Sequence, residues 1–291
     1  MPSRLKSVNY FAATGLPLAV VRIERQEAIH THTHEFSELV LIRAGRGVHF
    51  TRSEEYPVSA GDTFVIHGTM SHGYRDTDGL RLFNVLFDAR RLGIPLSDVR
   101  QMPGYHAMFE LEPRLRSRGN FRCRLRLSME SLARAETLVA RIEDEIHARA
   151  PGYRFLATAE FMRLVGMLAR CYEAGDAPDG RGLVRLGSVL GFLEGNYARP
   201  IRLGELADRA HMSESSLLRA FRKTMGVSPI DYLIRLRIRK AAELLCDDGT
   251  KVTETAFRVG FADGNYFSRQ FRRVTGLTPG EYRRHARYRI P

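Results

Sequence analysis

The feature that most constrains the fold is a repeat in the last hundred residues. The stretch 205–232 returns as the stretch 254–282, and six residues of the first copy recur fifty positions later. Self-similarity of this kind indicates one supersecondary unit used twice. The recurring residues are Arg219, Phe221, Arg222, Gly226, Pro229 and Tyr232, which return as Arg269, Phe271, Arg272, Gly276, Pro279 and Tyr282.

In each copy, apolar residues spaced three or four apart predict two short helices around a tight turn. Ser213 is a suitable N-cap for the second helix of the first copy, and Asp263 or Asn265 takes that role in the second copy. Gly226 is expected to end the first of these helices. The exposed faces are then Ser215, Ser216, Leu218, Arg219, Arg222 and Lys223 in one copy, and Asn265, Ser268, Arg269, Arg272 and Arg273 in the other.

A helix–turn–helix with such a face suits the DNA major groove, where Arg pairs with guanine and Asn with adenine. The alternative is that these polar residues only face solvent. The recurrence of the same exposed pattern in two copies favours DNA binding. Between the copies, residues 228–246 predict a single helix. About 20 residues at about 1.5 Å each give a rod of about 30 Å. That is close to the roughly 34 Å between successive major grooves on one face of the duplex.

The repeat resembles the DNA-binding domain of the AraC/XylS family of transcription regulators over about residues 188–288, most specifically in GFADGNYFSRQFRRVTGLTPGEYRR. The resemblance implies double-stranded DNA, RNA polymerase and a second copy of the chain as partners. Thr255 departs from the family pattern, which has a buried aliphatic residue there, and is expected to soften its helix. By resemblance the base-contacting positions are Ser215, Leu218 and Arg219, then Gly264, Asn265, Ser268 and Arg269.

The charge supports a polyanionic partner. The formal net charge is +12, and residues 191–291 hold 19 Lys and Arg against 11 Asp and Glu. A membrane surface is the competing partner, but the sequence has no long apolar run and no signal peptide. Cys123, Cys171 and Cys246 lack metal-ligand spacing and fit a reducing, cytoplasmic location.

Residues 1–95 contain short β-branched and aromatic segments bounded by Gly, Pro, Ser or Asp, and predict a small antiparallel barrel or sandwich. Within them, His30, His32, His34 and Glu38 share parity, so on one continuous strand they project from one face. HTHTHEFSELVLIRAGRG and GDTFVIHGTMSH resemble the two cupin motifs, with His72 in the second. The second motif departs from the pattern at His67, Thr69 and Asp76.

Three interpretations of these histidines remain open. In the first, a small polar effector binds in the barrel; the resemblance to sugar-responsive regulators implies a sugar, held by His30, His32, His34, Glu38 and His72. In the second, a divalent cation such as Fe, Mn, Ni or Zn is bound. In the third, the histidines are structural. The matching cupin residues for a metal are His32, His34, Glu38 and His72.

The remaining segments complete the domain organisation. Residues 91–127 read as a connection with one helical turn and a strand over Phe121–Leu127, where Tyr105, His106 and Phe109 either pack or touch a ligand. Residues 128–172 predict a helical hairpin that packs on the barrel or joins two subunits. The domains are a cupin-like effector-binding domain at 1–127, the hairpin at 128–172, a linker at 173–187 and the double helix–turn–helix domain at 188–291.

The expected fold class is α+β: a cupin-like β-barrel with a helical hairpin, then an all-α domain of two helix–turn–helix units joined by a long helix. The expected function is an effector-controlled, sequence-specific transcription regulator without catalytic residues. The alternative is a metal-dependent cupin enzyme with a basic nucleic-acid-binding tail.

Overall fold

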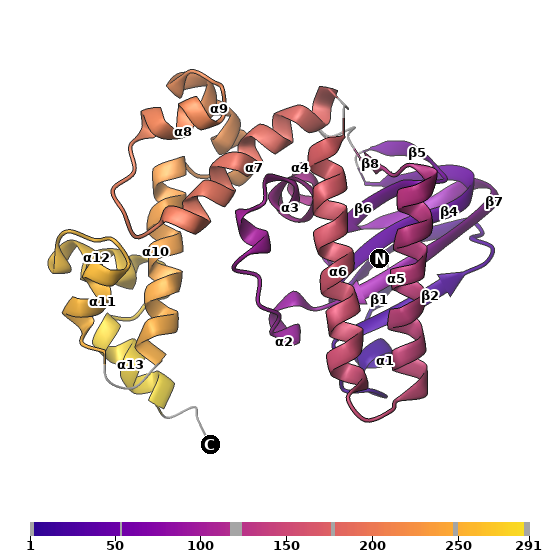
Figure 1. Ribbon diagram of the computed structural model, residues 1–291, viewed down its shortest axis with the longest axis horizontal. Helices are drawn as coiled ribbons and strands as arrows, with labels where there is room; N and C mark the ends of the chain where they lie inside the picture. The colour runs from indigo at the N-terminus through magenta and orange to yellow at the C-terminus, as the bar shows by residue number, and fades with distance from the viewer. Residues whose placement is uncertain (1–2, 53, 117–123, 176–177, 247–249, 288–291) are drawn as a thin grey trace. The chain divides into compact units, whose positions relative to one another are not determined.

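The computed structural model describes residues 3–52, 54–116, 124–175, 178–246 and 250–287 (Figure 1). The chain divides into two compact units, residues 1–187 and residues 188–291. The first joins a sheet to a layer of helices and the second is helical, so the predicted α+β class is confirmed. No helix within these ranges is long and apolar enough to cross a membrane.

The sheet of the first unit is organised around two long antiparallel strands, β4 (Ser37–Thr51) and β7 (His72–Phe87). They pair along their length, with register shifts between Ile42 and Val48. Such irregularities bend a strand, so the two ends of β4 and of β7 can lie in different layers of the sheet. The other strands are β1 (Ser3–Leu5), β2 (Leu18–Ile23), β3 (Ile29–His34), β5 (Glu55–Ser59), β6 (Asp62–Ile66) and β8 (Leu125–Arg126).

The bend depends on glycine. A Cβ on Gly45 of β4 would lie 2.1 Å from the carbonyl oxygen of Gly79 on β7, and Gly45 has a φ of +74°. Only glycine accepts both the contact and the backbone conformation. The inner faces of the two halves then share one core, which includes Val40, Ile42, Val58, Phe64, Ile66, Tyr74, Leu80 and Leu82.

Residues 89–116 are more helical than predicted. Pro103 begins a helix, where its missing N–H costs no hydrogen bond, instead of breaking one. Tyr105, His106 and Phe109 are buried and pack against one another. Of the predicted strand only β8 is present, and residues 121–123 lie outside the described ranges. The elements are α2 (Ala89–Leu92), η1 (Val99–Gln101), α3 (Pro103–Tyr105), the π-helical η2 (His106–Leu111) and α4 (Glu112–Arg116).

The predicted helical hairpin is confirmed as α5 (Met129–Ala148) and α6 (Tyr153–Ala174), which lie side by side against the sheet in Figure 1. Ser128 caps α5 by accepting a hydrogen bond from the backbone N–H of Ser131. One stripe of the hairpin is buried, and it comprises Leu132, Ala135, Val139, Ile142, Phe161, Leu164, Val165 and Leu168.

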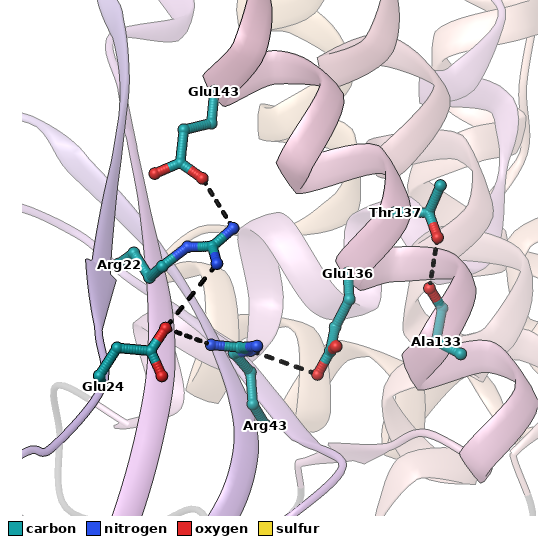
Figure 2. Close-up of polar contacts among 7 residues, drawn as sticks. All are labelled: Arg22, Glu24, Arg43, Ala133, Glu136, Thr137 and Glu143. Carbon is teal, nitrogen blue, oxygen red and sulfur yellow. Dashed lines mark hydrogen bonds and ion pairs between the residues drawn. The ribbon is translucent and has the colours of Figure 1, made fainter.

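Two arginines on the outer face of the sheet anchor α5 (Figure 2). Arg22 of β2 pairs with Glu143 at 2.9 Å, and Arg43 of β4 pairs with Glu136 at 3.4 Å. Both guanidinium groups also lie over the ring of Phe83, at 5.0 and 4.5 Å from its centroid. Strand β4 therefore contacts the hairpin directly.

The predicted linker at 173–187 is wrong for most of its length. Helix α7 spans Pro178–Asn196 and crosses the boundary between the two units. Leu183, Leu186 and Leu190 are buried and follow helical spacing. This amphipathic pattern outweighs the glycines that suggest an irregular segment.

The second unit repeats one arrangement twice. Phe221 and Tyr232 meet edge to face with centroids 5.9 Å apart, and their counterparts Phe271 and Tyr282 do so at 5.4 Å. The recurring sequence thus recurs as packing. The helices are α8 (Leu203–Arg209), α9 (Glu214–Met225), α10 (Pro229–Cys246), α11 (Val252–Arg258), α12 (Gly264–Thr275) and α13 (Pro279–Arg287).

Candidate functional site

Capping residues fix both ends of helices α9 and α12. The side chain of Ser213 accepts a hydrogen bond from a backbone N–H of the first turn of α9, and Asp263 accepts two at the start of α12. A glycine in the left-handed conformation ends each helix. Asp263, not Asn265, is therefore the N-cap, which leaves the Asn265 amide exposed.

Each helix buries an apolar face and turns its polar face outward. Leu217 and Phe221 of α9 are fully buried, as are Phe267 and Phe271 of α12. Among the predicted DNA-contacting residues, Ser215, Arg219, Arg222, Lys223, Asn265, Arg269, Arg272 and Arg273 are exposed, and Ser216, Leu218, Gly264 and Ser268 are half-buried.

Two of the exposed arginines are free to bind a partner. Arg219 and Arg269 form no ion pair with any described residue, unlike Arg199, which pairs with Glu205. Three serines are less available, because the hydroxyls of Ser215 and Ser216 hydrogen-bond with that of Ser213, and the Ser268 hydroxyl donates to the carbonyl of Gly264. Free guanidinium groups on a fixed helix suit base edges or phosphates.

Tyr266 is a member of this surface that the sequence analysis missed. It is 36% exposed at the start of α12, and the Arg269 guanidinium lies 5.9 Å from its ring centroid. A cation–π contact of this kind restrains the arginine. The repeat gives no hint of this contact, because the residue fifty positions earlier is Ser216, which has no ring.

Helix α10 sets the spacing between the two helical pairs. The 18 residues of α10 span about 27 Å at about 1.5 Å per residue.

Thr255, expected to soften α11, is fully buried, and its hydroxyl donates to the carbonyl of Lys251 at 3.0 Å. The hydrogen bond satisfies the buried hydroxyl, so the departure leaves no orphaned polar group at this position.

A second polar cluster lies inside the barrel. His32 of β3, Glu38 of β4 and His72 of β7 each offer a donor atom, and these atoms lie within 4.8 Å of one another. His34 joins them, with Nε2 3.2 Å from Glu38 Oε2. All four side chains are buried. The structure therefore brings together four of the five residues predicted for the effector.

His30 is the exception, and its assignment to this site is corrected. It is exposed, because the register of β3 against β7 shifts between Ile29 and His32. The shift breaks the alternation on which the shared parity relies. The continuous strand assumed from His34 to Glu38 is also wrong, since β3 ends at His34 and β4 begins at Ser37.

The charge state of the cluster follows from burial and proximity. Burial raises the pKa of Glu38, but the surrounding His34, His72 and His32 rings outweigh it and hold the pKa below its usual value. Burial lowers the pKa of His72 to about 4, despite the opposing effect of Glu38. A carboxylate thus faces a neutral imidazole inside the barrel.

Two buried polar residues beside the cluster were missed by the sequence analysis. His49 of β4 is fully buried with both ring nitrogens unpartnered, and the Tyr74 hydroxyl of β7 is unpartnered as well, among the residues described. The ring of His49 lies 5.5 Å from that of His72 and 5.1 Å from that of Tyr74. The register shifts in β4 turn His49 inward, so simple alternation could not find it.

A buried ion pair adjoins the same core. Arg116 pairs with Glu112 on α4, and its guanidinium lies 4.6 Å from the ring centroid of Phe64. Burial raises the pKa of Glu112 to about 7, although Arg116 acts in the opposite direction. This carboxyl therefore titrates near neutral pH in the folded chain.

Comparisons with known proteins cover nearly the whole chain. The AraC-like ligand binding domain matches residues 18–165, and a helix-turn-helix domain matches residues 206–285. The chain is 31% identical to the HTH-type transcriptional activator RhaR of Enterobacter sp. (strain 638), over 99% of this chain and 98% of that protein. It is 30% identical to the HTH-type transcriptional activator RhaS of Escherichia fergusonii, over 97% of each chain.

Proposed function

The chain belongs to the AraC family of DNA-binding transcription regulators, and we propose that it activates transcription when a sugar binds inside its barrel. The relatives are transcriptional activators, which favours a regulator over the alternative of a metal-dependent enzyme. The proposal assigns base contacts to α9 and α12 and effector contacts to the interior of the first unit.

The DNA contacts are supported by the two matching helix faces. Arg219 and Arg269 occupy equivalent exposed positions, and each has no ion-pair partner in the described chain. Arginine in such a position pairs bidentately with guanine. The exposed Asn265 adds an amide that suits adenine. Arg222, Arg272 and Arg273, one turn further along, are suited to phosphates.

The observation that carries the effector site is the set of unpartnered polar atoms inside the barrel. Both ring nitrogens of His49, Nε2 of His72 and the hydroxyl of Tyr74 have no hydrogen-bond partner among the described residues. Buried polar groups cost free energy unless they are satisfied. A polyhydroxylated molecule supplies both donors and acceptors, and so satisfies imidazole nitrogens and a hydroxyl together.

Signal transfer is proposed to run through β4. This strand carries Glu38 and His49 toward the interior and Arg43 toward α5, where it pairs with Glu136 (Figure 2). An effector shifts a conformational equilibrium only if it binds one state more tightly than another. Movement of β4 on binding would change the contact with the hairpin.

The hairpin is proposed as the contact between two subunits. Phe155 and Met162, two turns apart on α6, are 77% and 36% exposed. These exposed side chains offer apolar surface to a partner. A homodimer would bring together two DNA-binding units on neighbouring sites. RNA polymerase as a partner and a cytoplasmic location are proposed with it.

The test uses the full chain and a DNA site selected from random sequence. Its affinity for that site is measured with and without each member of a panel of monosaccharides, together with the melting temperature. One sugar is expected to change the DNA affinity and to raise the melting temperature. If no sugar changes either quantity, the effector proposal is wrong, while sequence-specific DNA binding stands or falls on the selection itself.

A further inference from the structure

We propose that a groove on the exposed face of the helical hairpin binds a nucleotide. The groove lies between α5 and α6 of the first unit and has a volume of about 580 Å³. Its lining includes four arginines and no acidic residue: Arg134 and Arg141 of α5, and Arg163 and Arg170 of α6. It shares no residue with the polar cluster inside the barrel, so the inference does not rest on the sugar response.

Two contacts across the hairpin show how the antiparallel helices are aligned. The Sγ atom of Cys171 lies 3.8 Å from the Oγ atom of Ser131. Two to three turns further along α5, Nη1 of Arg141 lies 3.5 Å from Oε1 of Glu160. Position 131 of α5 is therefore opposite position 171 of α6, and position 141 is opposite position 160.

This alignment sorts the four arginines into two pairs, each with one member from each helix. Arg134 and Arg170 are neighbours at one end of the groove, and Arg141 and Arg163 are neighbours at the other end. Seven residues separate the two arginines of each helix, so the pairs lie about 10 Å apart at about 1.5 Å per residue. The groove thus has positive charge at both ends.

The end formed by Arg134 and Arg170 is the position suited to phosphate. Both side chains are exposed, and neither forms an ion pair with any described residue. At the other end Glu160 lies within 3.5 Å of Arg141 and 3.2 Å of Arg163, so one carboxylate already serves that pair. Guanidinium groups donate parallel hydrogen bonds to phosphate oxygens, and two of them on separate helices can hold one phosphate group from two sides.

The floor between the two pairs is apolar and contains a helical glycine. Leu138 is buried and Met167 is half-buried. A Cβ added at Gly166 would meet nothing within 4 Å in the described chain beyond its own stretch of helix, whereas a Cβ at Gly104 would lie 2.0 Å from the carbonyl oxygen of Ala169. Glycine is a poor helix former, and packing within the described chain does not require it at position 166. The open space above it accepts a planar ring.

A nucleotide matches both parts of the groove. Its phosphate suits the pair of arginines without an acid, and its base suits the apolar floor, where a guanidinium group of the second pair can stack on the ring. The volume is in the range of roughly 300–1,000 Å³ that is usual for small-molecule sites.

Two other occupants fit less well. A second copy of the chain would place the same arginines against each other, because a twofold contact uses one surface on both subunits. The exposed Phe155 and Met162, which are proposed for the subunit contact, do not line the groove. A DNA duplex is much wider than the hollow between two packed helices, whose axes lie about 8–10 Å apart.

The experiment measures nucleotide binding to the full chain with its selected DNA site present in excess. The duplex covers the DNA-binding surface of the second unit, so a further anion has to bind elsewhere. Mononucleotides with one to three phosphates are titrated calorimetrically at physiological salt, beside their nucleosides and pyrophosphate. At least one nucleotide is expected to bind and to raise the melting temperature. Its nucleoside lacks the charge and pyrophosphate lacks the ring, so each should bind at least tenfold more weakly.

Variants locate the site. Arg134→Gln combined with Arg170→Gln should raise the Kd of the nucleotide at least tenfold. Gly166→Leu fills the space over the floor and should weaken binding by a similar factor without lowering the melting temperature, because leucine favours a helix more than glycine does. Arg81→Gln combined with Arg126→Gln is the matched control: it removes the same charge from two exposed arginines outside the groove, and the Kd should stay within twofold of the parent value.

Three results would overturn the inference. One is that no nucleotide binds the DNA-bound chain. Another is that pyrophosphate binds as tightly as every nucleotide, which would show only a general attraction of anions to a basic chain. The third is nucleotide binding that both groove variants leave intact, which would place the site elsewhere. None of them bears on the sugar response, whose probes carry no phosphate.

Discussion

Nε2 of His34 lies 3.2 Å from Oε2 of Glu38, although β7 separates their strands in the sheet. The two residues are close because only Glu35 and Phe36 connect the end of β3 at His34 to the start of β4 at Ser37. Strand β4 carries the Glu38 carboxylate into the cluster of imidazoles. The same strand pairs with α5 through Arg43. A change in that interior therefore has a short path to the hairpin.

His49 and Tyr74 should be required for the effector response but not for DNA binding. His49→Phe and Tyr74→Phe keep the ring volume and remove the polar atoms that face the interior. Each should reduce the sugar-induced change in DNA affinity at least tenfold, with the affinity of the free protein within twofold of the parent. His30→Ala serves as the control. A full response in both variants would place the effector elsewhere.

Arg43 should couple the barrel to the hairpin. Arg43→Met removes the pairs with Glu24 and Glu136 and keeps much of the packing on Phe83. The variant should still bind the effector, which is measured as a rise in melting temperature. The change in DNA affinity on effector binding should be smaller than in the parent chain. Arg46→Met is the matched control, since Arg46 lies on the same strand and pairs with the exposed Asp78. Equal responses in the two variants would exclude this route.

Gly260 should tolerate no side chain. Its φ is +94°, and an added Cβ would lie 2.6 Å from the carbonyl oxygen of Ala198. Gly260→Ala should destabilise the second unit by at least about 1–2 kcal/mol, the usual cost of the left-handed conformation. His211 occupies the same turn of the first helical pair, with a φ of +51°. His211→Gly should not lower the melting temperature. If it lowered the melting temperature more than Gly260→Ala does, the left-handed backbone conformation would not be the reason for glycine at this turn.

Glu112 should make stability depend on pH near neutrality. Burial raises its folded pKa to about 7, so between its usual value and about 7 the folded chain holds a proton that the unfolded chain has lost. The free energy of unfolding should therefore fall as pH rises through this window. Urea unfolding at pH 5, 6, 7 and 8 measures the slope. Glu112→Gln should flatten it, and an unchanged slope would assign the effect to other groups.

The helical domain was largely readable from sequence because its signals are local. Caps, glycine stops and a repeated spacing predict α9 and α12 directly, and Leu217 and Phe267 are buried as expected. The barrel was only partly readable, because the inward or outward direction of a strand residue depends on bulges. The register shifts in β3 and β4 excluded His30 and admitted His49. No short-range pattern in the sequence marks either shift.

The segments between domains were the least predictable. Glycine and proline suggest a linker over 173–187, yet α7 occupies most of it because its leucines pack on one face. Similarly, residues 99–116 form helices around a buried ion pair of Glu112 and Arg116. Tertiary packing outweighs local propensity in both places.

The most direct test of the account is selection of binding sites from random DNA by the full chain and by Arg219→Ala and Arg269→Ala. The parent chain should enrich two short elements about one helical turn apart. Each variant should lose preference at one element only, at a cost of about 1–3 kcal/mol on the parent site. Loss of affinity that is equal on all sequences, or no enriched element at all, would contradict sequence recognition by α9 and α12.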